Sequence, residues 1–355
     1  MRMREPIVVV IGAGVAGLTC ARELARRQVP NVVLERSRSV GGRCATRWIE
    51  GQPVDFGLPL LHATSREFGL ELNQLDESGK VVGWPLRVRE PRLACQPDAY
   101  RPGNRRLGRS AGVNEFARAL AAELDIRQRV HVTTLESAGP SVRVLTRDGE
   151  RFEAPFVVLA TELSETLRLA PPLVAGWPGA APLLERLRAL RAVRTLTVIA
   201  GYPKSIPDPG FDIWYPLEST MVHTIVNDSS KRADSPHRVL VIQGREVFSN
   251  ESYARTDDEW AHDLLWEAGE LLGAWVERPL WRQTHRWHCA RLRRGQSLGD
   301  VVNFESPDGA CVALCGDAFA VQTGLEAAYM SGIALGEQIG TLPRVRERVR
   351  EMSAG

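Results

Sequence analysis

Three glycines near the start of the chain have the spacing that binds the phosphates of a dinucleotide. Gly12, Gly14 and Gly17 form the pattern G-x-G-x-x-G. The first glycine permits a tight turn, the second leaves room for a pyrophosphate, and the third lets a helix pack closely on a strand. The N-terminus of that helix would offer free N–H groups to phosphate. Further along, the carboxylate of Glu35 has the chemistry to accept hydrogen bonds from ribose hydroxyls.

The flanking sequence supplies the elements that such a turn requires. Five apolar residues, 7–11, predict a strand that is buried on both faces. The glycine pattern then runs into a helical repeat with an apolar side, formed by Leu18, Ala21, Leu24 and Ala25. A second apolar run, 32–34, predicts the strand that ends in Glu35. Strand, turn, helix and strand in this order predict a Rossmann-type βαβ unit.

The next segment favours FAD over NAD. Gly41, Gly42 and Arg43 follow Glu35 closely, and the stretch Asp55-Phe56-Gly57 comes after them. An NAD-binding domain does not require a second glycine pair at this point.

These residues resemble those of a known family, the flavin-containing amine oxidoreductases. The family pattern runs from a terminal Glu through Gly-Gly-Arg and a Thr to Asp-x-Gly. Within the family, the short chain and the Ala-Thr-Arg at residues 45–47 look most like the renalase-like bacterial FAD-dependent oxidoreductases. The resemblance implies that residues 41–43 wrap the pyrophosphate and that residues 55–57 lie near the flavin ring.

A second glycine and acid pair stands near the C-terminus. The run 310–315 predicts a buried strand that ends in Gly316 and Asp317, and residues 323–332 predict the start of a long helix. Asp317 could bind a ribityl hydroxyl or order water on the pyrophosphate. The helix N-terminus would place a positive dipole at the pyrimidine edge of the flavin. The segment closely resembles the second FAD motif of the family. The predicted cofactor-binding residues are Gly12, Gly14, Ala16, Gly17, Glu35, Arg36, Gly42, Arg43, Asp55, Gly57, Gly316, Asp317, Gly324 and Leu325.

The candidate catalytic residues are aromatic. Residues 284–290 resemble a renalase-like segment in which Trp is followed by Arg-Tyr, whereas this chain has His288 and Cys289 there. The resemblance implies that Trp287 lies beside the isoalloxazine. The two histidines of this segment are either strand residues on opposite faces, or one of them contacts the substrate. A histidine at 62 is either structural or faces the flavin, and several tryptophans either line an apolar cavity or pack the core. The candidates are His62, Trp214, His285, Trp287 and His288.

The composition is that of an ordinary globular protein. The chain has 355 residues, 45 basic and 43 acidic side chains and a net charge of +2, which implies no nucleic-acid or anionic-membrane partner. Its six cysteines form no C-x-x-C pair, which favours reduced, packed thiols without a metal. No run reaches the roughly 18 apolar residues of a membrane span, and the N-terminal run lacks a cleavage-site pattern. We therefore expect a cytoplasmic protein.

The element pattern predicts an α/β protein of two domains. The first is a Rossmann-type FAD-binding domain of the two-dinucleotide-fold flavoprotein kind, expected over residues 1–60, 109–162 and 283–343. The second is an α+β substrate domain on an antiparallel sheet, expected over residues 61–108 and 163–282. Residues 344–355 are expected to be a loose tail.

The predicted function is FAD-dependent oxidation of a small molecule. Flavin N5 would accept a hydride, and dioxygen would reoxidise the flavin and yield hydrogen peroxide. The family implies an amine donor, and its renalase-like branch implies a dihydronicotinamide isomer. Many amine oxidases of the family have a lysine near N5 late in the chain, whereas the last lysine here is Lys231, which favours the renalase-like branch. The alternatives are a tailoring oxidase or desaturase of a larger apolar substrate and a flavoprotein without turnover. The oligomeric state is left open.

Overall fold

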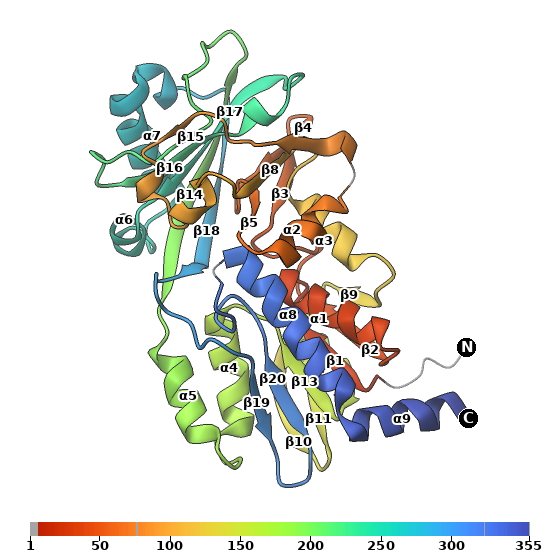
Figure 1. The fold of residues 1–355 in the computed structure, drawn as a ribbon. Coiled ribbons are helices and arrows are strands. Elements are labelled where there is room, and N and C mark those ends of the chain that lie inside the picture. Colours follow the sequence, from red (N-terminus) through yellow and green to blue (C-terminus); the bar gives the residue numbers. More distant parts are fainter. Residues whose placement is uncertain (1–5, 76, 323, 355) are drawn as a thin grey trace. The chain divides into compact units, whose positions relative to one another are not determined.

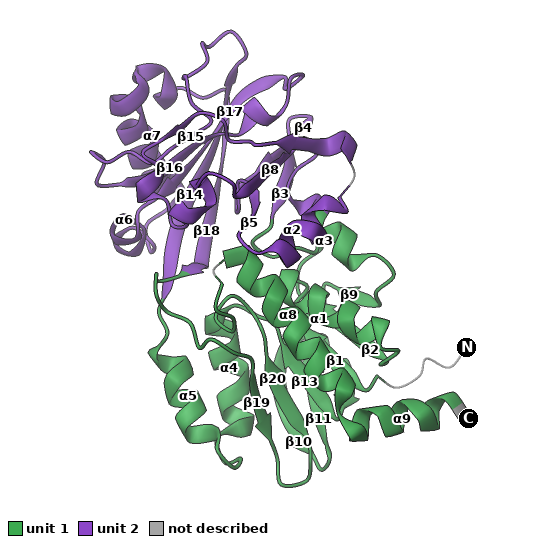
Figure 2. Ribbon diagram, viewed as in Figure 1, with its two compact units in different colours: residues 1–44, 116–191, 292–355 green, residues 45–115, 192–291 purple. Residues whose placement is uncertain are grey.

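The protein folds into two compact units, and each is assembled from separate stretches of the chain (Figures 1 and 2). The computed structural model describes residues 6–75, 77–322 and 324–354. Unit 1 comprises residues 1–44, 116–191 and 292–355, and unit 2 comprises residues 45–115 and 192–291. Residues 1–5 of the predicted FAD-binding domain and Thr323 of the predicted helix start lie outside the described part.

A mostly parallel sheet organises unit 1 (Figure 1). Its strand order is β19-β20-β13-β1-β2-β9. Only β19 runs antiparallel to its neighbour. The strands are β1 (Val8–Ile11), β2 (Asn31–Glu35), β9 (Ile126–Gln128), β13 (Phe156–Leu159), β19 (Val302–Glu305) and β20 (Cys311–Leu314). The central strands are buried throughout, as their unbroken apolar runs predict.

Two layers enclose this sheet. One face packs on a small antiparallel sheet and two helices, which share one apolar core with it. These elements are β10 (Val132–Ala138), β11 (Ser141–Thr146), β12 (Arg151–Ala154), α4 (Leu163–Val174) and α5 (Ala180–Ala189). The other face is covered by α1 (Val15–Arg26) and α8 (Gly324–Thr341), which lie side by side (Figure 1).

Glycines at every fourth position let α8 approach α1 closely. Residues four apart lie on the same helix face, and Gly332, Gly336 and Gly340 form such a stripe. A Cβ atom at Gly332 would lie 2.4 Å from the carbonyl oxygen of Ala16, and one at Gly336 would lie 2.9 Å from that of Cys20. Side chains are therefore excluded from this contact, and α1 is held against the helix that follows the second motif.

Unit 2 is built on a six-stranded sheet of order β18-β14-β17-β16-β15-β7. The strands are β7 (Val88–Arg89), β14 (Ala192–Pro203), β15 (Ile213–Trp214), β16 (Val222–Asn227), β17 (His237–Gly244) and β18 (Trp281–Leu292). The pairs β14–β17, β16–β17 and β15–β16 are antiparallel, as predicted for the substrate domain.

The two faces of this sheet have different cores. One face packs on α7 (Asp257–Leu272) and α6 (Glu246–Glu251), and the capping box of Thr256 and Glu259 begins α7. The other face packs on the hairpin of β3 (Thr46–Ile49) and β4 (Gln52–Asp55) and on its neighbours. Further regular elements are β5 (Leu61–Ala63), α2 (Arg66–Asn73), β6 (Lys80–Val82), β8 (Arg105–Arg109) and α3 (Asn114–Ala121). The described residues also form five short 3-10 helices: Glu77–Gly79, Pro91–Leu93, Pro97–Tyr100, Asp228–Lys231 and Ala274–Glu277.

The unit boundaries differ from the predicted domain boundaries. Residues 45–60, 109–115 and 283–291 belong to unit 2, because β3 and β4 pack on its core and β18 joins its sheet. Residues 163–191 belong to unit 1, because α4 and α5 share its core. The sequence did not predict α4, since Pro171 and Pro172 lie in its last turn.

The prediction of a loose tail from residue 344 onward is wrong, because residues 344–354 are helical. Helix α9 spans Pro343–Ala354 and begins with a proline, which suits the first turn of a helix. Val345 is fully buried, and Arg344 pairs with Glu305 and lies 4.8 Å from the ring centre of Phe156. Among the described residues, no helix combines the length and the apolar character that crossing a membrane requires.

We predict that Gly332→Ala lowers the free energy of unfolding by about 1–3 kcal/mol, because the new methyl group must push α8 away from α1. Gly176→Ala is the matched control, since a Cβ atom there would meet no atom within 4 Å. Urea unfolding followed by circular dichroism measures both variants. Equal stability of the two would contradict the close helix contact.

Candidate functional site

Packing explains two of the three glycines in the first turn. Gly12 follows β1 with φ +104°, and a Cβ atom on it would lie 2.7 Å from the carbonyl oxygen of Ala160. A Cβ atom on Gly17 would lie 2.0 Å from the carbonyl oxygen of Gly12. Both positions are glycine because the strand, the turn and helix α1 leave no space for a side chain.

Packing does not explain the glycine at position 14. Gly14 has φ −71° and ψ 172°, which any residue adopts, and a Cβ atom there would meet no atom within 4 Å. It is the N-cap of α1 and supplies no side-chain cap, so the first N–H groups of the helix keep their capacity to donate. The absence of a side chain therefore suits a group from outside the chain, and an anionic phosphate fits the helix N-terminus.

The second glycine pair lies beside this turn. Gly41 donates its N–H to the carbonyl oxygen of Ala13 at 2.8 Å and forms a bridge with Gly14. Gly41 and Gly42 both have positive φ, at 113° and 56°. The Gly-Gly-Arg segment is thus folded back onto the first glycine turn, and both present backbone rather than side chains to the same region.

Glu35 fastens the end of β2 to the turn. Its Oε2 accepts from the N–H of Ala13 at 2.8 Å, and its Oε1 accepts from the N–H of Ser37 at 2.7 Å. Each carboxylate oxygen can accept a further bond, so ribose hydroxyls fit this position. Arg36 lies 3.7 Å from Glu162, and Ala16 lies at the contact of α1 with α8.

An ion pair joins the two predicted motifs, which are 274 residues apart in the sequence. Arg43 donates to both carboxylate oxygens of Asp317, each at 2.8 Å. Burial alone would raise the pKa of Asp317, but the charge and hydrogen bonds of Arg43 hold that pKa below its ordinary value. The carboxylate is therefore ionised at neutral pH.

Next to Asp317, the backbone is tied to α8. Ser331 accepts from the N–H of Gly316 and donates to its carbonyl oxygen, both at 2.9 Å. Gly324 opens α8 with φ 64°, and Leu325 is buried behind it. The end of β20 is thus linked to α8 through Ser331.

In unit 2, Asp55 is the centre of a buried charge network. Its Oδ2 lies 2.5 Å from Nζ of Lys231, which also lies 2.6 Å from Asp228, and all three side chains are at most 1% exposed. Arg232 pairs with Asp228 at 2.6 Å. Thr46 donates to Oδ1 of Asp55 at 2.6 Å. Burial raises the pKa of Asp55, and the charges of Lys231 and Arg232 oppose that rise.

This network fixes the backbone on either side of it. Asp55 also accepts from the N–H of Val113, and Lys231 donates to the carbonyl oxygen of Pro59. The network therefore holds Phe56 and Gly57, which follow Asp55 directly. Gly57 is fixed further because its carbonyl oxygen accepts from the side chain of Gln243 at 3.1 Å.

Phe56 belongs to a cluster of three rings, which we call the aromatic trio: Phe56, His285 and Trp287. Trp287 stacks on Phe56 at 5.4 Å between ring centres, and His285 lies edge-on to both. Arg47 covers Phe56 at 4.5 Å and donates to Gln283. Burial and the charge of Arg47 lower the pKa of His285 to about 4, so the imidazole is neutral at pH 7.

The other candidate catalytic residues lie elsewhere in unit 2. Trp214 packs in the core on the α7 face of the sheet, whereas Phe56 and Trp287 pack on the opposite face. His288 is exposed and lies near Tyr253. It is three residues beyond His285 on the same strand, and residues an odd number apart on a strand point to opposite faces. His62 is buried on β5. Of the five candidates, His285 and Trp287 are in direct contact with each other.

Several residues of these clusters were not predicted. Sequence reasoning missed the pairing of Asp55 with Lys231 and the cover of Arg47 over Phe56. The spacing of Asp228, Lys231 and Arg232 was a usable signal, because acids and bases three or four apart can pair. No local signal links Asp55 to a lysine 176 residues away.

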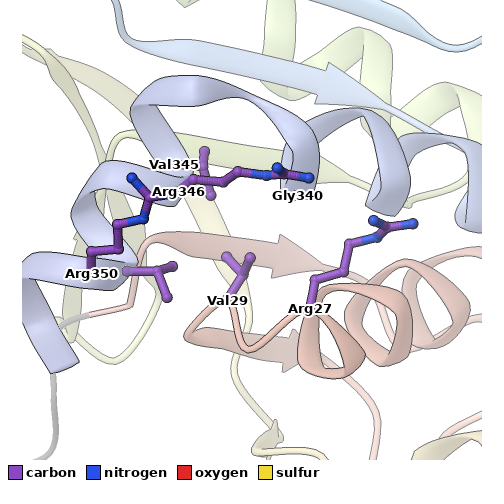
Figure 3. A pocket seen from close by; sticks show the side chains of 7 residues that line it. Arg27, Val29, Gly340, Val345, Arg346 and Arg350 are labelled. Atoms are coloured by element: carbon purple, nitrogen blue, oxygen red, sulfur yellow. The ribbon is translucent and has the colours of Figure 1, made fainter.

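A pocket in unit 1 lies away from the glycine turn. It measures about 310 Å³ and lies between the end of α1 and helix α9, among Arg27, Val29, Gly340, Val345, Arg346, Val349 and Arg350 (Figure 3). Arg27 is neutralised there by Glu23 and Glu337. The pocket is at the far end of α1 from the glycine turn.

Comparison with known families decides between the possible readings of this geometry. A family model described as flavin containing amine oxidoreductase matches residues 92–339, which is more than half of the chain. The chain belongs to this family. A second model, described as NAD(P)-binding Rossmann-like domain, matches residues 10–70. These matches confirm the predicted family and the predicted fold class. They also confirm FAD as the cofactor and the prediction of an FAD-dependent oxidoreductase.

Similarity to individual flavin-containing amine oxidoreductases is more limited. Polyamine oxidase 2 of Arabidopsis thaliana is 40% identical over 67 residues, which cover 19% of this chain and 14% of that protein. Cyclohexylamine oxidase from Brevibacterium oxydans superposes with a TM-score of 0.66 at 16% identity, covering 98% of this chain and 100% of that one. A putrescine oxidase bound to putrescine gives 0.63 at 15% identity, covering 95% and 99%. At these identities, the structures show a shared fold alone.

We predict that Gly14→Ala weakens FAD binding at least about 10-fold while lowering the stability of the apoprotein by less than about 1 kcal/mol. The methyl group has room within the chain and would collide only with a bound phosphate. FAD titration of the apoprotein measures the first effect and urea unfolding the second. Gly176→Ala is again the control, and unchanged FAD affinity of Gly14→Ala would contradict the assignment.

We predict that Lys231→Met lowers the free energy of unfolding by about 3–5 kcal/mol, because Asp55 and Asp228 would lose a buried counter-charge. Lys204→Met is the matched control, since Lys204 is exposed and its loss should change stability by less than about 0.5 kcal/mol. Thermal and urea unfolding measure both. A Lys231→Met variant as stable as the native protein would show that the network contributes no net stability.

Proposed function

We propose that the protein oxidises a small organic donor by transferring a hydride to FAD, and that dioxygen reoxidises the flavin. When bound, FAD supplies the electron-accepting chemistry at its N5 atom. The first glycine turn, the N-terminus of α1 and Gly42 would hold the pyrophosphate, and Glu35 would hold the ribose. The observation that carries the proposal is the pair of Arg43 with Asp317, because it brings both motifs of a flavin dinucleotide site together in unit 1.

The aromatic trio supports a role in holding the donor. Trp287 is only partly buried, and its ring, supported by the buried Phe56, offers a flat apolar face that can orient a planar molecule and exclude water. His285, with its pKa near 4, is a weak base at neutral pH and can donate or accept a hydrogen bond without becoming charged. This environment suits a donor that arrives in its neutral form and needs no strong base.

Two donor classes follow from the similarities. Relatives named polyamine oxidase and putrescine oxidase point to amines. The resemblance to renalase-like proteins points to dihydronicotinamide isomers, and this branch assignment remains a prediction. The position of Lys231 favours the second class, because its ammonium group is held by Asp55 and Asp228.

The test is anaerobic bleaching of the bound flavin near roughly 450 nm, where oxidised flavin absorbs. Dihydronicotinamide isomers form one arm, and primary and secondary amines form the other. We expect fast bleaching by the dihydronicotinamides, followed by return of the colour and release of hydrogen peroxide on admitting air. Bleaching by amines alone would move the protein to the amine-oxidising branch. A flavin that no donor of either class reduces would overturn the proposed function.

A further inference from the structure

The pocket between α1 and α9 combines an apolar floor with a rim of positive charges. Its volume is about 310 Å³, and ligand pockets in proteins begin at about this size. Val29, Val345 and Val349 line it, and we call these three residues the valine floor. In Figure 3, Val29 and Val345 lie between the side chains of Arg27 and Arg350. All lining residues belong to unit 1, so the pocket is complete within that unit.

Two of the three arginines of the pocket have no counter-charge. Arg27 is paired with Glu23 at 2.7 Å and with Glu337 at 3.0 Å. The side chains of Arg346 and Arg350 are exposed, and neither pairs with a residue in the part of the chain that the structure describes. The two are four apart on α9, so their charges lie on one face of the helix and repel each other. An anion bound between them would offset this repulsion.

The acids nearby do not neutralise these two charges. Helix α9 contains four arginines and two glutamates. The glutamates, Glu347 and Glu351, directly follow Arg346 and Arg350, and adjacent residues do not face each other on a helix. None of the described residues that line the pocket is an acid. The field at the pocket is therefore positive, which favours an anionic ligand.

The pocket is distinct from the proposed cofactor site. Gly14 is the N-cap of α1, and Arg27 is its C-cap. The helix has 12 residues, so at 1.5 Å per residue its ends are roughly 18 Å apart. A small ligand beside Arg27 would therefore not compete with a phosphate bound at Gly14.

We propose that this pocket binds a small amphipathic anion, a carboxylate with a short apolar chain. The chain packs on the valine floor, and the carboxylate accepts hydrogen bonds from Arg346 and Arg350, whose planar guanidinium groups match its geometry. At about 30 Å³ per water molecule, the pocket holds roughly ten non-hydrogen atoms, which is the size of octanoate. The inference goes beyond the proposed function and does not rest on it.

The test compares three ligands on the FAD-loaded protein. Octanoate has both the charge and the chain, acetate has the charge alone, and octylammonium has the chain with the opposite charge. Isothermal titration calorimetry at about pH 7.5 measures each Kd. We expect octanoate to bind with Kd below about 1 mM, and the other two at least about 10-fold more weakly. Acetate or octylammonium binding as tightly as octanoate, or no binding of octanoate, would overturn the proposal.

Variants of α9 locate the binding in this pocket. The double variant Arg346→Gln/Arg350→Gln should weaken octanoate about 10-fold, because each exposed ion pair contributes at most about 1 kcal/mol. Its melting temperature and its FAD content should not change. Arg348→Gln is the matched control, since Arg348 is exposed on the same helix and does not line the pocket. An octanoate affinity that the double variant leaves unchanged, or that Arg348→Gln lowers equally, would overturn the proposal.

A third variant tests the valine floor. Val349→Thr keeps the shape of the side chain and replaces a methyl group by a hydroxyl. It should weaken octanoate about 3-fold or more, because the chain would then pack against a polar group. Octanoate binding that is sensitive to both arginines and insensitive to Val349→Thr would show an anion site without a place for the chain, and would contradict the amphipathic ligand.

Discussion

The contact between Arg43 and Asp317 is the interaction on which the cofactor site of unit 1 depends. The two residues come from opposite ends of the chain, and each follows a glycine that gives the backbone close access to a ligand. Around this pair, Glu35 fixes the first turn to β2, and Ser331 fixes Gly316 to α8. The glycine stripe of α8 then holds α1 in place. The pair is partly exposed, so its effect is better described as positioning than as a large contribution to stability.

Unit 2 differs from unit 1 because its central charged side chains are buried. Asp55 and Lys231 are completely shielded from solvent, and desolvation makes such a pair costly unless every group is satisfied. Here Thr46, Val113 and the carbonyl of Pro59 supply the additional hydrogen bonds. The result is a support directly before Phe56, which fixes the position of one ring of the aromatic trio.

The sequence predicted best those elements that depend on residues close together in the chain. Unbroken apolar runs identified β1, β13 and β20, and the glycine spacing identified the turn before α1. The pairing of Asp55 with Lys231 could not be predicted, because it depends on the packing of segments 176 residues apart. Helix α9 was missed for a related reason: its charged sequence is stabilised by Val345 and Arg344 reaching the rest of unit 1. Trp214 and His288 had the right chemistry, but the alternation of strand residues places them on the face opposite to Phe56.

One glycine of the first turn is not required by the fold itself. Gly12, Gly17 and Gly332 must be glycine because backbone atoms occupy the space of a side chain, whereas Gly14 has open space and ordinary dihedral angles. A glycine at position 14 costs conformational entropy on folding and gains no packing in return. A phosphate bound at the N-terminus of α1 would offset that cost. Gly14 therefore supports the proposed cofactor site at the start of α1.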